Sequence, residues 1–139
     1  LFVVIEGIRF AGVIDLIAGL FYRIAGNNPF LLYTLIVFIS VALSAFIDNI
    51  PYVTTMIPVV ASLASMMGKE PLVFYFGLLI GATLGGNLTP IGASANITAI
   101  GILRKNGYEV KNSDFLKIGI PFTMAAVVVG YAFIWLVWG

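Results

Sequence analysis

The stretch that decides the fold of this chain is GGNLTPIGASAN, residues 85–96. It lies in an uncharged run of 33 residues between Glu70 and Arg104, whereas about 20 apolar residues suffice to cross a bilayer. The run is too long for one straight helix, and its glycines, proline and polar side chains make a poor helix. We therefore predict a broken helix over 71–104, in which 86–95 form an unwound polar link. Unwound backbone at membrane depth is tolerated only where it is buried in protein or lines a wet cavity.

A second polar interruption, DNIP at residues 48–51, separates two apolar runs of 19 and 16 residues. Asn28 is predicted to cap the first run and Pro29 to open it, so that a hairpin covers 29–67 with its tip at 48–51. One interpretation is an ordinary turn between two full spans, because Asp-Asn-x-Pro is good turn chemistry. The other is a re-entrant hairpin that carries the carboxylate of Asp48 into the membrane. Such a carboxylate is costly unless a cation or a proton accompanies it.

The composition is that of a membrane protein. Of the 139 residues, 61% are hydrophobic and 9% are charged, and the mean hydropathy is +1.11, whereas about 25% of an ordinary soluble domain is charged. The chain contains no cysteine and no histidine, which excludes thiolate and imidazole chemistry. The net charge is +1 without a basic run, so no nucleic acid is expected as a partner. We expect an all-α polytopic protein of the inner or plasma membrane, surrounded by the lipid bilayer.

The flanking segments complete this arrangement. Residues 1–7 are predicted to end a spanning helix, and the more charged segment 8–27 to form an interfacial helix, with an ordinary span as the alternative. Residues 113–119 are predicted as a second interfacial helix. A final span over 121–138 follows, because Pro121 is expected to restart the chain. Since the chain starts within an apolar run, we expect a missing N-terminal part.

The residues that break the helices are also potential ligands. A glycine-rich face for helix packing is the alternative for 85–96, and it explains Gly81 and Gly85 but not the amides and hydroxyls that follow. Two interrupted hydrophobic segments close in sequence indicate a transporter binding site. The predicted ion or solute site consists of Asp48, Asn49, Thr55, Gly86, Asn87, Thr89, Ser94 and Asn96. Among these, Asp48, Asn49 and Asn87 are the expected Na⁺ ligands, with Na⁺ or H⁺ as coupling ion and no other cofactor.

Three motifs carry a family resemblance: SAFIDNIP at 44–51, TMIP at 55–58 and GGNLTPIGASAN at 85–96. They resemble the ArsB/NhaD-type ion transporter superfamily, above all its pink-eyed dilution (P protein) branch, and the match covers that family's C-terminal half. The resemblance implies an inverted-repeat fold, in which each half supplies a re-entrant hairpin and a discontinuous helix. Related divalent-anion/sodium symporters have a Ser-Asn-Thr tip where this chain has Asp48-Asn49-Ile50. This carboxylate favours a cation or proton ligand over direct contact with an anionic solute.

These observations predict an ion-coupled secondary active transporter, which moves a small inorganic or organic ion by alternating access. A passive ion channel on the same fold is the alternative. An aspartyl intramembrane protease needs two carboxylates that share a proton, and this chain offers one at depth, so we expect no enzyme. Half a transporter does not enclose a site between two repeats. The expected partner is therefore the missing N-terminal half or a second subunit, and a homodimer is also compatible.

Overall fold

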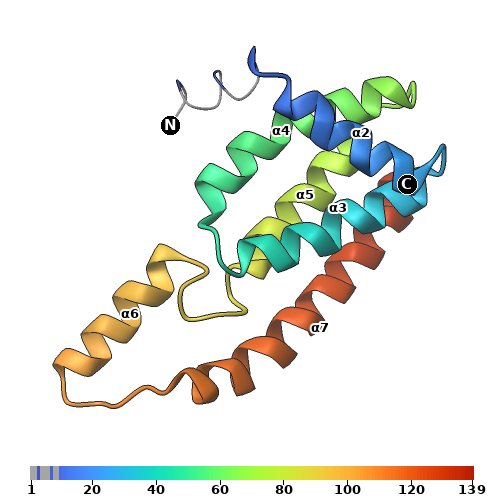
Figure 1. Ribbon diagram of the computed structural model, residues 1–139. Helices are drawn as coiled ribbons and strands as arrows, with labels where there is room; N and C mark the ends of the chain where they lie inside the picture. Colours follow the sequence, from blue (N-terminus) through green and yellow to red (C-terminus); the bar gives the residue numbers. More distant parts are fainter. Residues whose placement is uncertain (1–2, 4–6, 8–9) are drawn as a thin grey trace.

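The computed structural model describes Val3, Gly7 and residues 10–139. Within these residues the chain forms helices and no strand, which confirms the all-α prediction (Figure 1). Two predictions fall partly outside the described residues. These are the helix end at 1–7, of which only Val3 and Gly7 are described, and the interfacial helix at 8–27, of which residues 8–9 are not described. The helices are α2 (Val13–Ala25), α3 (Pro29–Ser44), α4 (Asn49–Met66), α5 (Leu72–Gly85), α6 (Ser94–Lys105) and α7 (Asn112–Trp138).

The start of α3 follows from local chemistry. Pro29 is its first residue, and the side-chain oxygen of Asn28 accepts hydrogen bonds from the backbone N–H groups of Phe30 (3.0 Å) and Leu31 (3.2 Å). This cap satisfies two donors that lack a partner inside the helix. The prediction of Asn28 as the cap is therefore confirmed.

The hairpin formed by α3 and α4 starts and finishes at the same end of the molecule. Pro29 at its start and Lys69 just after its end line one pocket of about 280 Å³, together with Trp138 at the end of α7. In Figure 1 the turn between α3 and α4 lies far from this end, near the link between α5 and α6. The hairpin thus projects its polar turn toward the other polar interruption.

The closest helix packing joins α3 and α5. Gly77, Gly81 and Gly85 recur at one-turn spacing on α5 and face α3. A Cβ atom on Gly81 would lie 2.4 Å from the carbonyl oxygen of Val37, and one on Gly85 would lie 2.6 Å from that of Val41. Only glycine allows the two backbones to approach so closely, as at many helix interfaces in membranes. The glycine-rich packing face is thus present, and it ends where the polar link begins.

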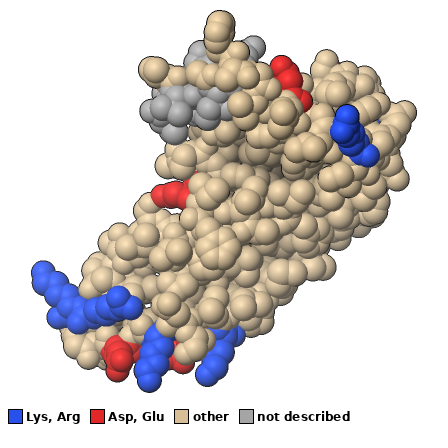
Figure 2. Space-filling view, in the orientation of Figure 1, with Lys and Arg blue, Asp and Glu red and all other residues tan. Residues whose placement is uncertain are grey.

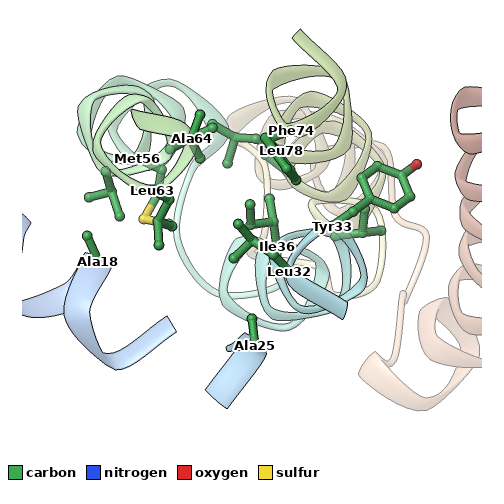
Figure 3. Packing of buried hydrophobic residues seen from close by; sticks show 14 of the residues in the cluster. Ala18, Ala25, Leu32, Tyr33, Ile36, Met56, Leu63, Ala64, Phe74 and Leu78 are labelled. Atoms are coloured by element: carbon green, nitrogen blue, oxygen red, sulfur yellow. The ribbon is translucent and has the colours of Figure 1, made fainter. Parts of the chain in front are cut away.

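Larger side chains fill the space between the remaining helices. In Figure 3, Ala18 of α2 faces Met56 and Leu63 of α4, and Ala25 lies beside Leu32 of α3. The other labelled side chains of this cluster, all buried, are Tyr33, Ile36, Ala64, Phe74 and Leu78. This core connects α2, α3, α4 and α5 into one packed unit and leaves α6 outside it.

The last helix differs from the predicted arrangement. The sequence predicted an interfacial helix over 113–119 and a separate span over 121–138, whereas α7 is one helix of 27 residues with Pro121 inside it. A proline costs the bond to the carbonyl four residues earlier, here that of Lys117. Lys117 is exposed close to the helix start, where solvent can satisfy this carbonyl. Pro121 therefore does not divide the helix.

Aromatic side chains hold the far part of α7 against α3. The Tyr33 hydroxyl donates to the carbonyl oxygen of Tyr131 at 2.9 Å, and the two rings stack with centroids 5.1 Å apart. The hydroxyls of Thr34 and Tyr131 are also hydrogen-bonded, at 2.8 Å. Because α5 packs on α7 as well, the last helix is fixed on two sides of the unit.

Two described helices, α4 with 18 residues and α7 with 27, are long and apolar enough to cross a membrane. The apolar helices α3 and α5 are shorter, with 16 and 14 residues. Figure 2 shows charged side chains mainly at the two ends of the molecule, and a broad uncharged surface between them that a single acidic group interrupts. An apolar band between charged ends is typical of a membrane protein.

Candidate functional site

The two polar interruptions meet in the folded chain. Asp48, the residue before α4, accepts a hydrogen bond through its carboxylate from the hydroxyl of Ser94, the first residue of α6. The hydroxyl of Thr89 donates to the backbone carbonyl of Ala45 in the hairpin turn. These contacts join segments that lie more than 40 residues apart in the sequence. The hairpin turn and the link therefore form one polar region.

A buried node lies beneath this region. The Ser44 hydroxyl is 2.6 Å from both the Ala82 carbonyl oxygen and the Asn49 side-chain oxygen. A hydroxyl carries one proton and the Ala82 carbonyl can only accept, so the proton goes to Ala82. Since Ser44 then has only an acceptor left for Asn49, the amide nitrogen of Asn49 fits the node best when it faces Ser44. The oxygen and nitrogen of an amide are assigned from their hydrogen bonds, so this orientation needs only a flip of the amide. In either orientation Ser44 ties the first residue of α4 to the last turn of α5.

The link keeps a compact shape around backbone oxygens. The amide nitrogen of Asn96 donates to the carbonyl oxygens of Gly86 (2.9 Å) and Thr89 (3.1 Å). A Cβ atom on Gly92 would lie 2.6 Å from the Gly86 carbonyl oxygen and 2.8 Å from that of Ala45. The absence of a side chain at Gly92 thus lets the link fold back against the hairpin turn. The predicted break at 86–95 corresponds to residues 86–93 between α5 and α6.

Six of the eight predicted site residues take part in these contacts, and two lie elsewhere. The six are Asp48, Asn49, Gly86, Thr89, Ser94 and Asn96. The hydroxyl of Thr55 instead donates to the carbonyl of Pro51 within α4, at 2.8 Å. Asn87 lines a pocket of about 310 Å³ with Phe115 and Gly119, on the side of the link that faces α7. Asp48 and Asn49 are thus adjacent at the turn, while the third predicted Na⁺ ligand faces α7.

The chemistry available to a cation here is one carboxylate and neutral oxygens. In the part of the chain that the structure describes, no group of three or more acidic, histidine or cysteine side chains gathers. Carbonyl, hydroxyl and carboxylate oxygens are hard ligands that suit Na⁺ better than a transition metal. A single carboxylate also suits reversible protonation.

Sequence reasoning missed Ser44 and the backbone carbonyls of Ala45 and Ala82. Ser44 stands four residues before Asp48 and opens the first motif, so its position was a signal. The sequence cannot single out these backbone carbonyls, because every residue carries one. Only the packing of α3 against α5 selects those that face the polar region.

Comparison with known proteins identifies the family. The citrate transporter family, CitMHS, matches residues 1–139. The chain belongs to the CitMHS family. This confirms the predicted ArsB/NhaD-type membership, and the family and its named relatives are transporters and not enzymes.

Among the relatives of this CitMHS chain, one is a transporter by name and another is a membrane protein by name. An uncharacterized transporter of Mycobacterium tuberculosis is 36% identical over 138 residues, which are 98% of this chain and 32% of the relative. The 46 kDa membrane protein of Mycobacterium leprae is 31% identical over the same lengths. The P protein of Homo sapiens is 38% identical over 102 residues, which are 72% of this chain and 12% of that protein. No solved structure matches. The chain thus spans about a third of the mycobacterial relatives.

A double-mutant cycle tests the Ser44 node. In the full-length protein we expect Ser44→Ala and Asn49→Ala each to destabilise the fold by about 1–3 kcal/mol, because Ser44→Ala removes both hydrogen bonds of the node and Asn49→Ala leaves the buried Ser44 oxygen without its second partner. The two losses should not add, with a coupling of about 0.5–3 kcal/mol. The measurement is unfolding by denaturant in detergent, with Ser65→Ala at an exposed position of α4 as the control. Additive losses would mean that Ser44 and Asn49 do not interact.

Proposed function

We propose that this chain is part of an ion-coupled secondary active transporter and that Asp48 is its coupling carboxylate. Na⁺ or H⁺ bound at Asp48 would drive the movement of a small inorganic or organic ion by alternating access. The observation that carries the proposal is the contact between Asp48 in the hairpin turn and Ser94 at the start of α6. It places a carboxylate where two helix ends and an unwound link converge, which is the usual setting of a transporter site.

The depth of this contact supports an intramembrane site. Along α6, Ser94 lies about 16 Å from the charged residue Lys105. Along α3, the chain travels about 24 Å from Pro29 to the hairpin turn. The two helices approach the contact from opposite ends of the molecule (Figure 1), and their summed length of about 40 Å is close to a bilayer with its headgroups. Since α3 is shorter than the hydrocarbon core of about 30 Å, we favour the re-entrant hairpin over two full spans.

The surroundings of Asp48 also support a bound cation or proton. Asp48 is the only charged residue between Arg23 and Lys69, and no charge occurs between Glu70 and Arg104. Its carboxylate makes no capping bond to α4, so the hydroxyl of Ser94 is the partner that the structure gives it. A carboxylate in an apolar band with a neutral partner is stabilised by binding a cation or by taking up a proton.

The exposure of the site supports a further protein partner. Asp48 is half-buried and Ser94 is exposed, so their contact opens onto the surface of this chain. Lipid tails cannot solvate a carboxylate. Since the chain spans about a third of its mycobacterial relatives, the remaining N-terminal part of the transporter or a second subunit would cover this opening. The close packing of α3 on α5 supports their movement as one body.

Reconstitution tests this function. The full-length protein is placed in proteoliposomes, and uptake of labelled citrate, other carboxylates, chloride or arsenite is measured under a Na⁺ or a pH gradient at zero membrane potential. Citrate comes first because it appears in the family's name. We expect one of these solutes to accumulate inside the vesicles above its equilibrium concentration. We also expect exchange of labelled for unlabelled solute without any gradient. Flux that follows only the electrical gradient, without exchange, would show a channel instead.

A further inference from the structure

A second surface, remote from the polar region, has its own chemistry. We define the basic connection as residues 104–117, which join the end of α6 to the first turns of α7. It carries Arg104, Lys105, Lys111 and Lys117 against Glu109 and Asp114, a net charge of +2, and all six side chains are exposed. Figure 2 shows these charges gathered at one end of the molecule, next to the uncharged surface.

The basic connection is an ordered turn. Gly107 has a φ of 83°, and the backbone N–H of Tyr108 donates to the carbonyl of Leu103 at 3.0 Å, which closes α6 with a left-handed C-cap. The amide nitrogen of Asn106 donates to the carbonyl of Ile102 at 2.8 Å. The guanidinium of Arg104 reaches the carbonyl of Val110 at 3.4 Å. These bonds order the backbone from which the basic side chains extend at the end of α6.

The exposed apolar side chains of α7 indicate the depth of the lysines relative to the lipid. Directly after Lys117, the side chains of Ile118 and Phe122 are 74% and 63% exposed, as expected for lipid-facing positions. Lys117 therefore marks the edge of the hydrocarbon, and Lys111 lies about 9 Å further out along the helix. Each headgroup layer is about 5–7 Å thick. Lys111 and Lys117 thus bracket the level of the lipid phosphates, and the flexible stems of lysines allow both to reach it.

Most of these cations have no acidic partner. Within the described residues, the one ion pair is Lys117 with Asp114, at 3.9 Å and with both side chains largely exposed. Lys105 and Lys111 are exposed, and Arg104 contacts the neutral carbonyl of Val110. Beside them the ring of Tyr108 is 65% exposed, and tyrosine is enriched at membrane interfaces.

We propose that the basic connection binds the phosphate groups of anionic phospholipids in the adjoining leaflet. The cations provide charge complementarity, Arg104 retains free donors for a phosphate oxygen, and Tyr108 packs among the headgroups. The binding would anchor the outer end of α6, which has no extensive packing against another described helix. Lipid composition would thereby act on the helix whose inner end holds Ser94.

Lipid titration tests the proposal on the full-length protein in nanodiscs. Binding of fluorescent phosphatidylglycerol is measured against a phosphatidylcholine background. Each removed cation should weaken binding about fivefold, so Arg104→Gln with Lys105→Gln should weaken it about 25-fold. The matched control removes one arginine and one lysine at the other end, Arg23→Gln with Lys69→Gln, and should leave the affinity unchanged. Arg104→Lys with Lys105→Arg keeps both charges and should retain binding even if the neutral variant fails to fold.

Two results would overturn the proposal. Equal losses in the two neutral double variants would show only a general effect of protein charge. Displacement of the lipid by inorganic phosphate at constant ionic strength would show a site for a free anion instead of a lipid. Retained binding of labelled lipid in the presence of phosphate, together with the selective loss at the α6 end, is the expected outcome.

Discussion

Replacement of Asp48 by asparagine in the full-length protein is expected to abolish ion-coupled uptake and leave the fold intact. The amide has the size of the carboxylate and can still accept a hydrogen bond from the Ser94 hydroxyl, but it neither ionises nor binds a cation strongly. Uptake driven by an ion gradient should fall to the level of vesicles without protein. The measurement is labelled solute uptake in proteoliposomes, with thermal unfolding in detergent to verify the fold.

The same variant separates the two coupling ions. An amide resembles a protonated carboxyl group in charge and size, so under H⁺ coupling Asp48→Asn should retain solute exchange and lose its pH dependence. Under Na⁺ coupling the variant should lose both uptake and exchange, because a ligand of the ion is missing. Asp114→Asn is the matched control, since Asp114 is exposed in the first turn of α7. Unchanged gradient-driven uptake in Asp48→Asn would refute the coupling role.

Gly81→Ala is expected to have a large effect on stability. The new Cβ would lie 2.4 Å from the carbonyl oxygen of Val37 and 2.7 Å from the Cβ of Ser40. Because a backbone oxygen cannot rotate away, α3 and α5 must separate, and overpacking of this kind costs about 1–3 kcal/mol. The separation would also move Ser44 from the Ala82 carbonyl, which lies in the same interface. The measurement is the midpoint of thermal unfolding of the full-length protein in detergent.

Gly101→Ala provides the control for that experiment. Gly101 also lies inside a helix, α6, but a Cβ there meets no atom within 4 Å. An exposed alanine in a helix is favoured over glycine by about 1 kcal/mol. Gly101→Ala should therefore leave the midpoint unchanged or raise it. If Gly81→Ala were as stable as Gly101→Ala, the close approach of α3 and α5 would be incorrect.

Local chemistry explains which helix ends the sequence could predict. Asn28 and Pro29 act on the nearest backbone groups, so the start of α3 was readable without any tertiary contact. The glycines and Pro90 disfavour a helix by themselves, so a break after Gly85 was readable too. Pro121 was ambiguous, because proline both opens helices and is tolerated inside long ones. Its place within α7 depends on whether the carbonyl of Lys117, which loses its helical partner, is exposed in the folded chain, and the local sequence does not contain that information.

The sequence alone determined that this chain is an apolar, all-α part of a transporter with two polar interruptions, because composition, helix breakers and family motifs are local properties. Tertiary structure decided which of the polar residues meet. Asp48 and Ser94 are 46 residues apart, and the glycine stripe of α5 brings them together by allowing α3 to pack at backbone distance. The same packing brought Ser44 into the node, whereas Thr55 bonds within α4 and Asn87 lies against α7. Contacts between distant residues depend on how whole helices pack, and no local pattern specifies that.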